Sequence, residues 1–283
     1  AMMPDTIGLI AGEGRLPVLV AQGMKQAGLR VGCVAFRGHP DPELRALCDE
    51  WADVSLYRPG GWIRRLQRWN AHEAVMVGRV AKTRMHDPFR IVRNLPDWRA
   101  LRLWYRRLRH DRRDAAVLSA VAEELSNSGI TLIDSTTHIP EHMAEAGTLG
   151  RQSPSPSQTS DITFGWPLLQ DVANMGVGQS IAVREGDIIA VEAVEGTDRM
   201  IDRAGELCRA KGWCLLKTAS HNHDRRADVP TIGVNTIDRL SEAGCGCIAV
   251  GAGAVILLDR PEVIAACDQA GIAIVGVSAK AID

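Results

Sequence analysis

The amino-terminal third of the chain alternates short apolar runs with helical spacing, and this alternation most constrains the fold. Apolar runs at residues 7–12, 31–36 and 74–78 are typical of buried strands. Residues 16–27 have helical spacing and lead into Gly28, which suits a helix C-cap. Parallel neighbouring strands need a crossover connection, usually a helix. The strand–helix–strand order therefore predicts a parallel, doubly wound sheet.

The composition changes after residues 130–133, the last apolar run of the first half. Residues 151–160 are rich in Ser and Pro and lack periodicity, which predicts a loop or hinge. We therefore place a domain boundary near residue 134, with one α/β domain at 1–134 and a second at 135–283. In the second domain we expect strands at 180–183, 188–194, 213–217, 247–250 and 272–275, and helices at 165–176, 198–211, 235–244 and 260–270.

Composition and charge argue against several classes of protein. The 33 basic and 34 acidic residues nearly cancel, so nothing in the charge favours nucleic acid as a partner. The seven cysteines include no C-x-x-C pair, which fits a reducing compartment. No apolar run approaches the roughly 18 residues needed to span a bilayer. We expect a soluble, cytoplasmic protein.

The most informative local motif runs over residues 224–233, Asp-Arg-Arg-Ala-Asp-Val-Pro-Thr-Ile-Gly. Asp224 and Asp228 flank paired arginines, so the carboxylates can hold a divalent cation and the guanidiniums a phosphate. A second acidic cluster, which includes Glu195, follows the apolar run at 188–194. Together the clusters indicate a metal-assisted phosphate site. The alternative for the first is a solvated loop before a buried strand.

Two glycines follow the first predicted strand. Gly12 and Gly14 begin like a dinucleotide-binding turn, but Pro17 occupies the third glycine position. Arg37 follows Phe36 where an acidic residue would bind the ribose, so the pattern disfavours nicotinamide cofactors. The backbone amides of this turn can still receive a phosphate at a helix start. A tight turn without a ligand is the alternative.

Basic residues lie in two further places. Arg79 and Lys82 directly follow the third predicted strand, at the end of a parallel sheet where ligands bind. Four arginines form a stripe that begins on the predicted helix at 98–109 and continues to residue 113. That stripe is either a solvated face or a surface attracted to anionic lipid headgroups.

Seven short stretches are spread in order along nearly the whole chain: residues 8–17, 77–82, 96–97, 114–118, 178–180, 191–198 and 224–233. Together they resemble the LpxI-type UDP-2,3-diacylglucosamine pyrophosphatase family of lipid A biosynthesis. The resemblance implies a Rossmann-like amino-terminal domain, a family-specific carboxy-terminal domain, and a substrate bound between them. Asp228 matches the aspartate that is essential in the family.

The activity implied by the resemblance is magnesium-dependent cleavage of the substrate's pyrophosphate. The products are UMP and 2,3-diacylglucosamine 1-phosphate, known as lipid X. A glycolipid substrate implies peripheral contact with the inner-membrane surface. The sequence does not decide between a monomer and a homodimer. Hard oxygen ligands suit Mg²⁺ or Mn²⁺ and favour carboxylates over His221 and His223, which would suit zinc but lack a matching ligand set.

These considerations predict the following site residues. Asp228, Asp224 and Glu195 are predicted as the catalytic groups and metal ligands. The predicted substrate contacts are Gly12, Gly14, Arg79, Lys82, Thr197, Lys217, Arg226 and Thr231.

One departure from the family pattern affects the expected function. Family members carry Lys-x-x-Lys-Pro before the acidic motif, whereas this chain has Ser220 and His221 in place of the second lysine and the proline. If that lysine contacts a phosphate, the loss is roughly 1–3 kcal/mol. One alternative function is a nucleotide-dependent phosphoryl or nucleotidyl transferase acting on another sugar or lipid. The other, favoured by Ser220, is a non-catalytic lipid-binding homologue.

Overall fold

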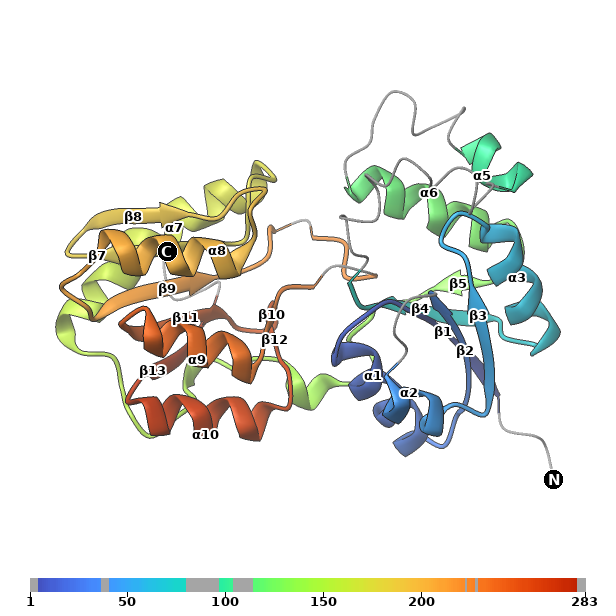
Figure 1. Ribbon diagram of the computed structural model, residues 1–283, viewed down its shortest axis with the longest axis horizontal. Coiled ribbons are helices and arrows are strands. Elements are labelled where there is room, and N and C mark those ends of the chain that lie inside the picture. Colours follow the sequence, from blue (N-terminus) through green and yellow to red (C-terminus); the bar gives the residue numbers. More distant parts are fainter. Residues whose placement is uncertain are drawn as a thin grey trace. The chain divides into compact units, whose positions relative to one another are not determined.

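The computed structural model describes residues 5–36, 41–79, 97–103, 114–221, 223–226 and 229–278. By their internal contacts the residues form two compact units, each with its own sheet and helices (Figure 1). Unit 1 comprises Ala1–Ile139 and Asp224–Asp228, and unit 2 comprises Pro140–His223 and Val229–Asp283. A short segment from late in the sequence therefore belongs with the amino-terminal unit.

Unit 1 contains a five-stranded sheet with the order β3-β2-β1-β4-β5, and all its strands are parallel. The central strand β1 pairs with β2 on one side and β4 on the other, so the strand order reverses between β1 and β4. Doubly wound sheets bind ligands at such a reversal. The elements are β1 (Thr6–Ala11), α1 (Leu16–Gln26), β2 (Arg30–Phe36), α2 (Pro42–Leu47), β3 (Glu50–Val54), α3 (Pro59–Arg68), β4 (Glu73–Val77), α5 (Trp98–Leu103), α6 (Asp114–Ser126) and β5 (Thr131–Leu132).

Alternating residues of the central strands bury against opposite helical layers, as the two-residue period of a strand requires. Ile10 and Val34 belong to one buried cluster with Trp62 of α3 and Leu125 of α6. Helix α1 packs on β1 and β2, and Leu9 is fully buried as well. Helix α2 and the edge strand β3 were not predicted, because β3 alternates only over a short stretch. The part of the predicted helix 98–109 beyond α5 lies outside the described residues.

Unit 2 contains a mixed six-stranded sheet with the order β6-β13-β11-β9-β7-β8, in which β13, β11 and β9 are parallel. The strands β6, β7 and β8 pair antiparallel with their neighbours, and β10 pairs with β12 separately. The elements are a 3₁₀ turn (Pro140–His142), β6 (Gly147–Thr148), α7 (Pro156–Asn174), β7 (Ser180–Arg184), β8 (Asp187–Val191), α8 (Thr197–Leu207), β9 (Trp213–Lys217), β10 (Thr231–Ile232), α9 (Val234–Glu242), β11 (Cys245–Gly251), β12 (Ile256–Leu257), α10 (Arg260–Ala270) and β13 (Ala273–Val277).

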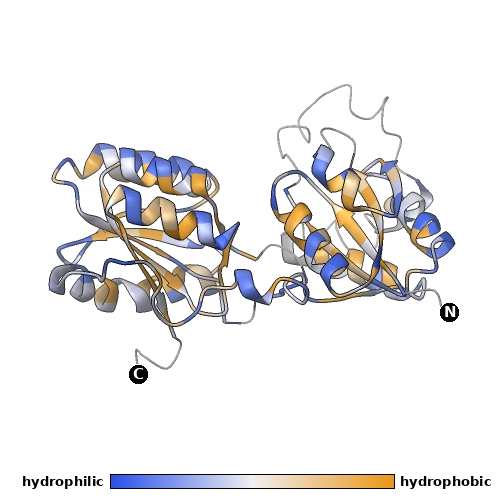
Figure 2. Ribbon diagram, turned by 90° about the horizontal axis from the view of Figure 1, so that it is seen from below, coloured by the Kyte–Doolittle hydropathy of each residue, from blue (hydrophilic) through white to orange (hydrophobic). Residues whose placement is uncertain are grey.

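Helices cover both faces of this second sheet. Helix α7 packs on one face through Trp166 and Leu169, which contact the buried residues of β7 and β9. Helices α8, α9 and α10 cover the other face, where Met200, Leu240 and Val263 join a larger cluster. Hydrophobic strands lie between helices with hydrophilic outer faces (Figure 2). The prediction of an α/β protein with a parallel amino-terminal sheet and a second α/β domain is confirmed.

Helix α7 begins earlier than the sequence suggested. The prediction of a loop over residues 151–160 was wrong from Pro156 onward, because Ser155 and Gln158 form a reciprocal capping box. The Gln158 amide donates to Ser155 Oγ (3.2 Å), and the Ser155 amide donates to Gln158 Oε1 (2.9 Å). Proline at the first helical position needs no amide partner, so a Ser-Pro-Ser-Gln stretch can start a helix. No helix in the described parts of the chain is long and apolar enough to cross a membrane.

Candidate functional site

A glycine turn follows β1 and is hydrogen-bonded to the carboxyl end of β4, where the strand order of unit 1 reverses. The Gly12 amide donates to the Val77 carbonyl (2.8 Å), and Glu13 and Arg79 exchange two backbone hydrogen bonds (2.9 and 2.8 Å). A Cβ atom at Gly12 would lie 2.5 Å from the Arg79 carbonyl oxygen, so a larger residue would push these backbones apart. Gly14 has a positive φ of 106°, which glycine adopts without strain. The structure thus brings Gly12, Gly14 and Arg79 together.

A buried polar network in unit 2 contains two more of the predicted residues. Lys217 Nζ at the end of β9 donates to Thr197 Oγ1 (2.9 Å) at the start of α8. Thr197 in turn donates to Glu192 Oε1 (2.9 Å), and Ser180 donates to Glu192 Oε2. Ser180 is fully buried, while Lys217 is 5% exposed and Glu192 9%. Burying charged groups is costly unless they are hydrogen-bonded, and here each is.

Two glycines shape the backbone around this network. A Cβ atom at Gly178 would lie 2.0 Å from the Glu192 carbonyl oxygen, so only glycine fits that crossing. The Glu192 amide donates to the Ser180 carbonyl (2.9 Å), which continues the β7–β8 pairing by one residue. Gly196 then turns the chain with a φ of 83° and caps α8, which places Thr197 at the first helical position. The network therefore depends on backbone geometry as well as on side chains.

Glu195 was the residue predicted from this stretch, whereas Glu192 and Ser180 were not predicted. Glu195 Oε1 accepts from Nη2 of Arg203 in α8 (2.7 Å), and the Glu195 side chain is 24% exposed. Nothing in residue type separates the two glutamates. The useful signal was that Glu192 directly follows a strand, while Ser180 begins the neighbouring one. Both lie in stretches that carry the family resemblance.

The acidic motif after β9 forms local ion pairs within unit 1. Arg226 Nε and Nη2 donate to the Asp224 carboxylate at 2.8 and 2.5 Å, and the Arg226 amide donates to it as well (3.1 Å). This hydrogen bonding raises the pKa of the Arg226 guanidinium. The predicted metal ligand Asp224 and the predicted phosphate contact Arg226 thus bind each other. Both side chains remain about one-third exposed (31% and 37%) and accessible to a ligand.

The remaining predicted residues are distributed as follows. Thr231 begins β10 and pairs with Ile256 of β12. Lys82 and Asp228 lie outside the described residues. Among the described residues, no three His, Cys, Asp or Glu side chains gather closely enough to hold a cation. Asp224 belongs to unit 1 and Glu195 to unit 2.

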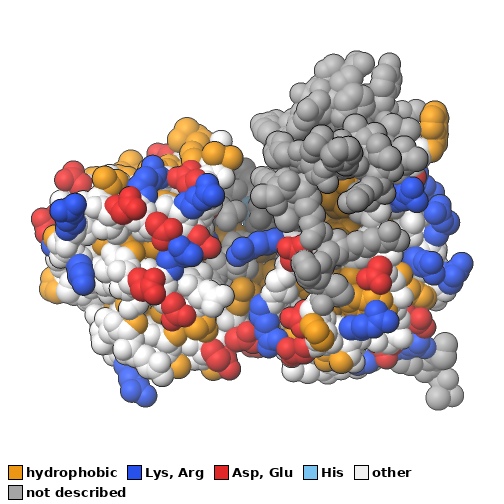
Figure 3. All heavy atoms as spheres, viewed as in Figure 1, with side chains coloured by type: hydrophobic (Ala, Val, Ile, Leu, Met, Phe, Trp, Pro, Cys, Tyr) orange, Lys and Arg blue, Asp and Glu red, His pale blue; other side chains and the backbone are white. Residues whose placement is uncertain are grey.

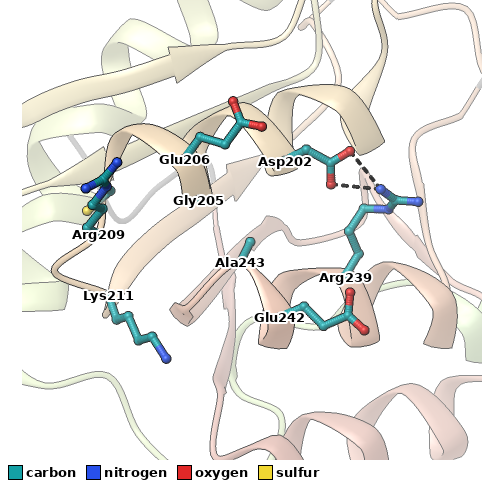
Figure 4. Close-up of a pocket in the computed structure, with 9 residues that line it drawn as sticks. Asp202, Gly205, Glu206, Arg209, Lys211, Arg239, Glu242 and Ala243 are labelled. Atoms are coloured by element: carbon teal, nitrogen blue, oxygen red, sulfur yellow. Dashed lines mark hydrogen bonds and ion pairs between the residues drawn. The ribbon is translucent and has the colours of Figure 1, made fainter.

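A shallow groove lies between the carboxyl-terminal halves of α8 and α9 in unit 2 (Figure 4). Asp202 and Arg239 form a two-bond ion pair across it (2.7 and 2.8 Å). Acidic and basic side chains are mixed over this face of the unit (Figure 3). Lys211 in the groove precedes β9, whereas Lys217 ends that strand, so the groove and the buried network lie at opposite ends of β9. The groove has no part in the candidate site.

Comparison with known proteins relates these features to other sequences. Residues 6–142 match the family described as the LpxI N-terminal domain, and residues 145–275 match the LpxI C-terminal domain. The UDP-2,3-diacylglucosamine pyrophosphatase LpxI of Caulobacter vibrioides is 32% identical over 281 residues. That alignment covers 96% of this chain and 97% of the relative.

Among solved structures, two N5-carboxyaminoimidazole ribonucleotide synthetases are distantly similar. The ADP complex of one is 12% identical, with a TM-score of 0.26, over 74% of this chain and 46% of the other. The enzyme from Staphylococcus aureus is 13% identical, with a TM-score of 0.22, over 72% of this chain and 45% of the other. This chain thus spans less than half of either structure, and TM-scores this low carry no argument about function.

Proposed function

Because this chain belongs to the LpxI family, we propose that it hydrolyses the pyrophosphate bond of UDP-2,3-diacylglucosamine. Water adds across the P–O–P bridge: its oxygen bonds to one phosphorus, and the bridging oxygen leaves with the other. The products are UMP and 2,3-diacylglucosamine 1-phosphate. The observation that carries the proposal is the 32% identity to a pyrophosphatase of this name over almost the full length of both chains.

The described geometry supports this chemistry in two places. A pyrophosphate diester is an anion, and charge-assisted donors bind it well. The glycine turn of Gly12 and Gly14 ends beside Arg79 at the reversal of the unit 1 sheet, a usual position for phosphate groups. Lys217 ends a strand next to Thr197 at the amino terminus of α8, where backbone amides favour anions. We assign these residues, with Lys82, Arg226 and Thr231, to substrate binding.

The proposed reaction also involves a divalent cation. We propose Mg²⁺ or Mn²⁺ with Asp228, Asp224 and Glu195 as ligands, because hard oxygen donors suit these ions. Such an ion would neutralise phosphate charge and help activate water. Binding of the substrate between the two domains stays a prediction. Two acyl chains keep the substrate at a membrane, so we also propose peripheral contact with the inner-membrane surface.

The experiment measures UMP release from UDP-2,3-diacylglucosamine in mixed micelles. Purified protein should release UMP and the diacylated sugar phosphate, lose this activity in EDTA, and regain it with Mg²⁺ or Mn²⁺. Asp228→Ala should lower kcat at least about a hundredfold. Asp238→Ala, an exposed aspartate on α9, is the matched control and should retain wild-type activity.

Each alternative predicts a different result. A protein that binds the glycolipid but releases no UMP would be the non-catalytic homologue suggested by Ser220. UMP release only with an added acceptor would indicate a transferase. Full activity of Asp228→Ala would remove that residue from the mechanism.

A further inference from the structure

The acidic segment contacts the rest of unit 1 through both the backbone carbonyl and the side chain of Arg225. The chain leaves unit 2 after β9, contributes Asp224–Asp228 to unit 1, and returns to unit 2 at Val229. The Arg225 carbonyl accepts two hydrogen bonds, from the Ser135 amide (2.9 Å) and from Ser135 Oγ (2.8 Å). Ser135 is 2% exposed, so water competes little for these bonds.

The side chains of the same residues add a second layer of contacts. Arg225 Nε pairs with Asp134 Oδ2 (3.2 Å), and Arg225 Nη2 donates to Thr136 Oγ1 (2.8 Å). Thr136 closes the set, because its hydroxyl and its amide both donate to Asp134 Oδ1 (2.7 Å each). Two nitrogen atoms of the Arg225 guanidinium thus contact neighbouring residues of unit 1.

The loop that makes these contacts is itself fixed on helix α1. A Cβ atom at Gly23 would lie 1.7 Å from the carbonyl oxygen of His138, so the loop backbone packs directly on the helix. Ile139, the next residue, is fully buried. The partners of Arg225 therefore lie on a loop that packs closely against a helix, and such packing favours accurate placement of a reacting group.

We propose that Asp134, Ser135 and Thr136 are positioning residues that hold Arg225 and thereby fix the acidic segment for catalysis. This inference rests on the proposed function. Arg225 lies between Asp224 and Arg226, the ion pair assigned to metal and phosphate, and three residues before Asp228. A small displacement of reacting groups lowers rates steeply. The set acts through the backbone of the segment and does not touch substrate.

The test is a double-mutant cycle with Asp134→Ala, Arg225→Ala and the combined variant, measured by UMP release. Each single variant should lower kcat about 10- to 100-fold with KM changed less than about threefold. The double variant should be no slower than the slower single variant, because each single substitution already removes the ion pair between Asp134 and Arg225. Asp202→Ala, which breaks the Asp202–Arg239 ion pair of unit 2, is the matched control and should keep the wild-type kcat.

A role in stability alone would give a different pattern. Exposed ion pairs stabilise proteins little, so the Tm of Arg225→Ala should change by less than about 4 °C. Asp134→Ala also removes the acceptor of the amide and the hydroxyl of the buried Thr136, so its Tm should fall further. Unchanged kcat in both single variants, or multiplied losses in the double variant, would overturn the proposal. A raised KM in Arg225→Ala with normal Asp134→Ala would instead make Arg225 a substrate contact, which also overturns it.

Hydrogen exchange separates this inference from the proposed function. Amides in the peptide that spans residues 218–226 should exchange faster in Asp134→Ala than in the wild type, and not in Asp202→Ala. If the wild type released no UMP, the proposed function would fail, and exchange would still decide whether the segment is anchored. Equal exchange in all three proteins would show that it is not.

Discussion

The acidic segment of unit 1 and the buried network of unit 2 use similar groups in different environments. In the segment, the paired side chains of Asp224 and Arg226 remain about one-third exposed. In the network, Glu192 and Lys217 are each less than one-tenth exposed. The segment is held to its unit through the backbone carbonyl and the guanidinium of Arg225, whereas side-chain hydroxyls link the charged groups of the network.

This difference in burial predicts different effects of substitution on stability and on activity in the two regions. Exposed ion pairs contribute about 0–1 kcal/mol because water and salt screen them. Loss of an acceptor from a buried network leaves donors without partners and costs about 1–3 kcal/mol for each. Substitutions in the network should therefore destabilise the protein, while substitutions in the segment should act mainly on catalysis.

The largest expected effect is on stability, in a direct comparison of Glu192→Ala with Asp224→Ala. Glu192→Ala removes the acceptor of both Ser180 and Thr197 and should lower the free energy of unfolding of unit 2 by roughly 2–5 kcal/mol. Asp224→Ala should lower stability by less than about 1 kcal/mol. Urea unfolding followed by tryptophan fluorescence measures both, and Trp213 reports on unit 2.

Glu192→Gln refines this comparison because its amide keeps one acceptor oxygen for the two hydroxyls. It should fall between the wild type and Glu192→Ala. Equal stability losses in Glu192→Ala and Asp224→Ala would contradict the contrast between the two regions.

A second prediction asks whether the buried network serves chemistry as well as packing. Lys217→Met keeps most of the side-chain volume but removes the ammonium group. If Lys217 contacts a phosphate, kcat/KM for UMP release should fall about 10- to 150-fold, the equivalent of about 1.5–3 kcal/mol. Lys211→Met, at the exposed other end of β9, is the control and should match the wild type. A variant that loses stability but keeps kcat/KM would make the network purely structural.

The elements of the fold were predictable where the pattern was local. The runs that form β1, β2 and β4 are apolar throughout, and the repeated crossovers dictate a parallel sheet. The start of α7 was not predicted, because Ser-Pro composition indicates a loop although Ser155 and Gln158 form a capping box. Strand β3 was missed because it fully buries only alternate positions of a short edge strand.

The candidate site was less predictable because its contacts are tertiary. The sequence predicts Lys217 and Thr197 as separate substrate contacts, and the structure joins them by one hydrogen bond. Glu192 and Glu195 are chemically identical in sequence, and only the end of β8 and the turn at Gly196 bury one of them. The contacts of Ser135 with Arg225 join residues 90 positions apart, and no local pattern encodes such a pair.

The smallest expected effect concerns pH, and it distinguishes the anchoring loop of unit 1 from the network of unit 2. His138 lies in that loop, and its buried Nε2 atom has no hydrogen-bond partner among the described residues. Burial lowers the pKa of His138 below its usual value of 6.5, although the charge of Glu73 opposes the change. The folded state therefore binds a proton on His138 less readily than the unfolded state does.

The sign of the effect follows from this difference in proton binding. Above pH of about 6.5, His138 is neutral in both states and contributes no pH dependence. As the pH falls below that value, the unfolded state takes up the proton first, so the free energy of unfolding decreases until the folded pKa is passed. His138 is only partly buried, so the total loss should stay below about 1 kcal/mol. The variant His138→Gln should lose this dependence between about pH 7.5 and 5, where carboxylates remain largely ionised. Parallel stability–pH curves for the two proteins would mean that protonation of His138 does not strain the loop that holds Arg225.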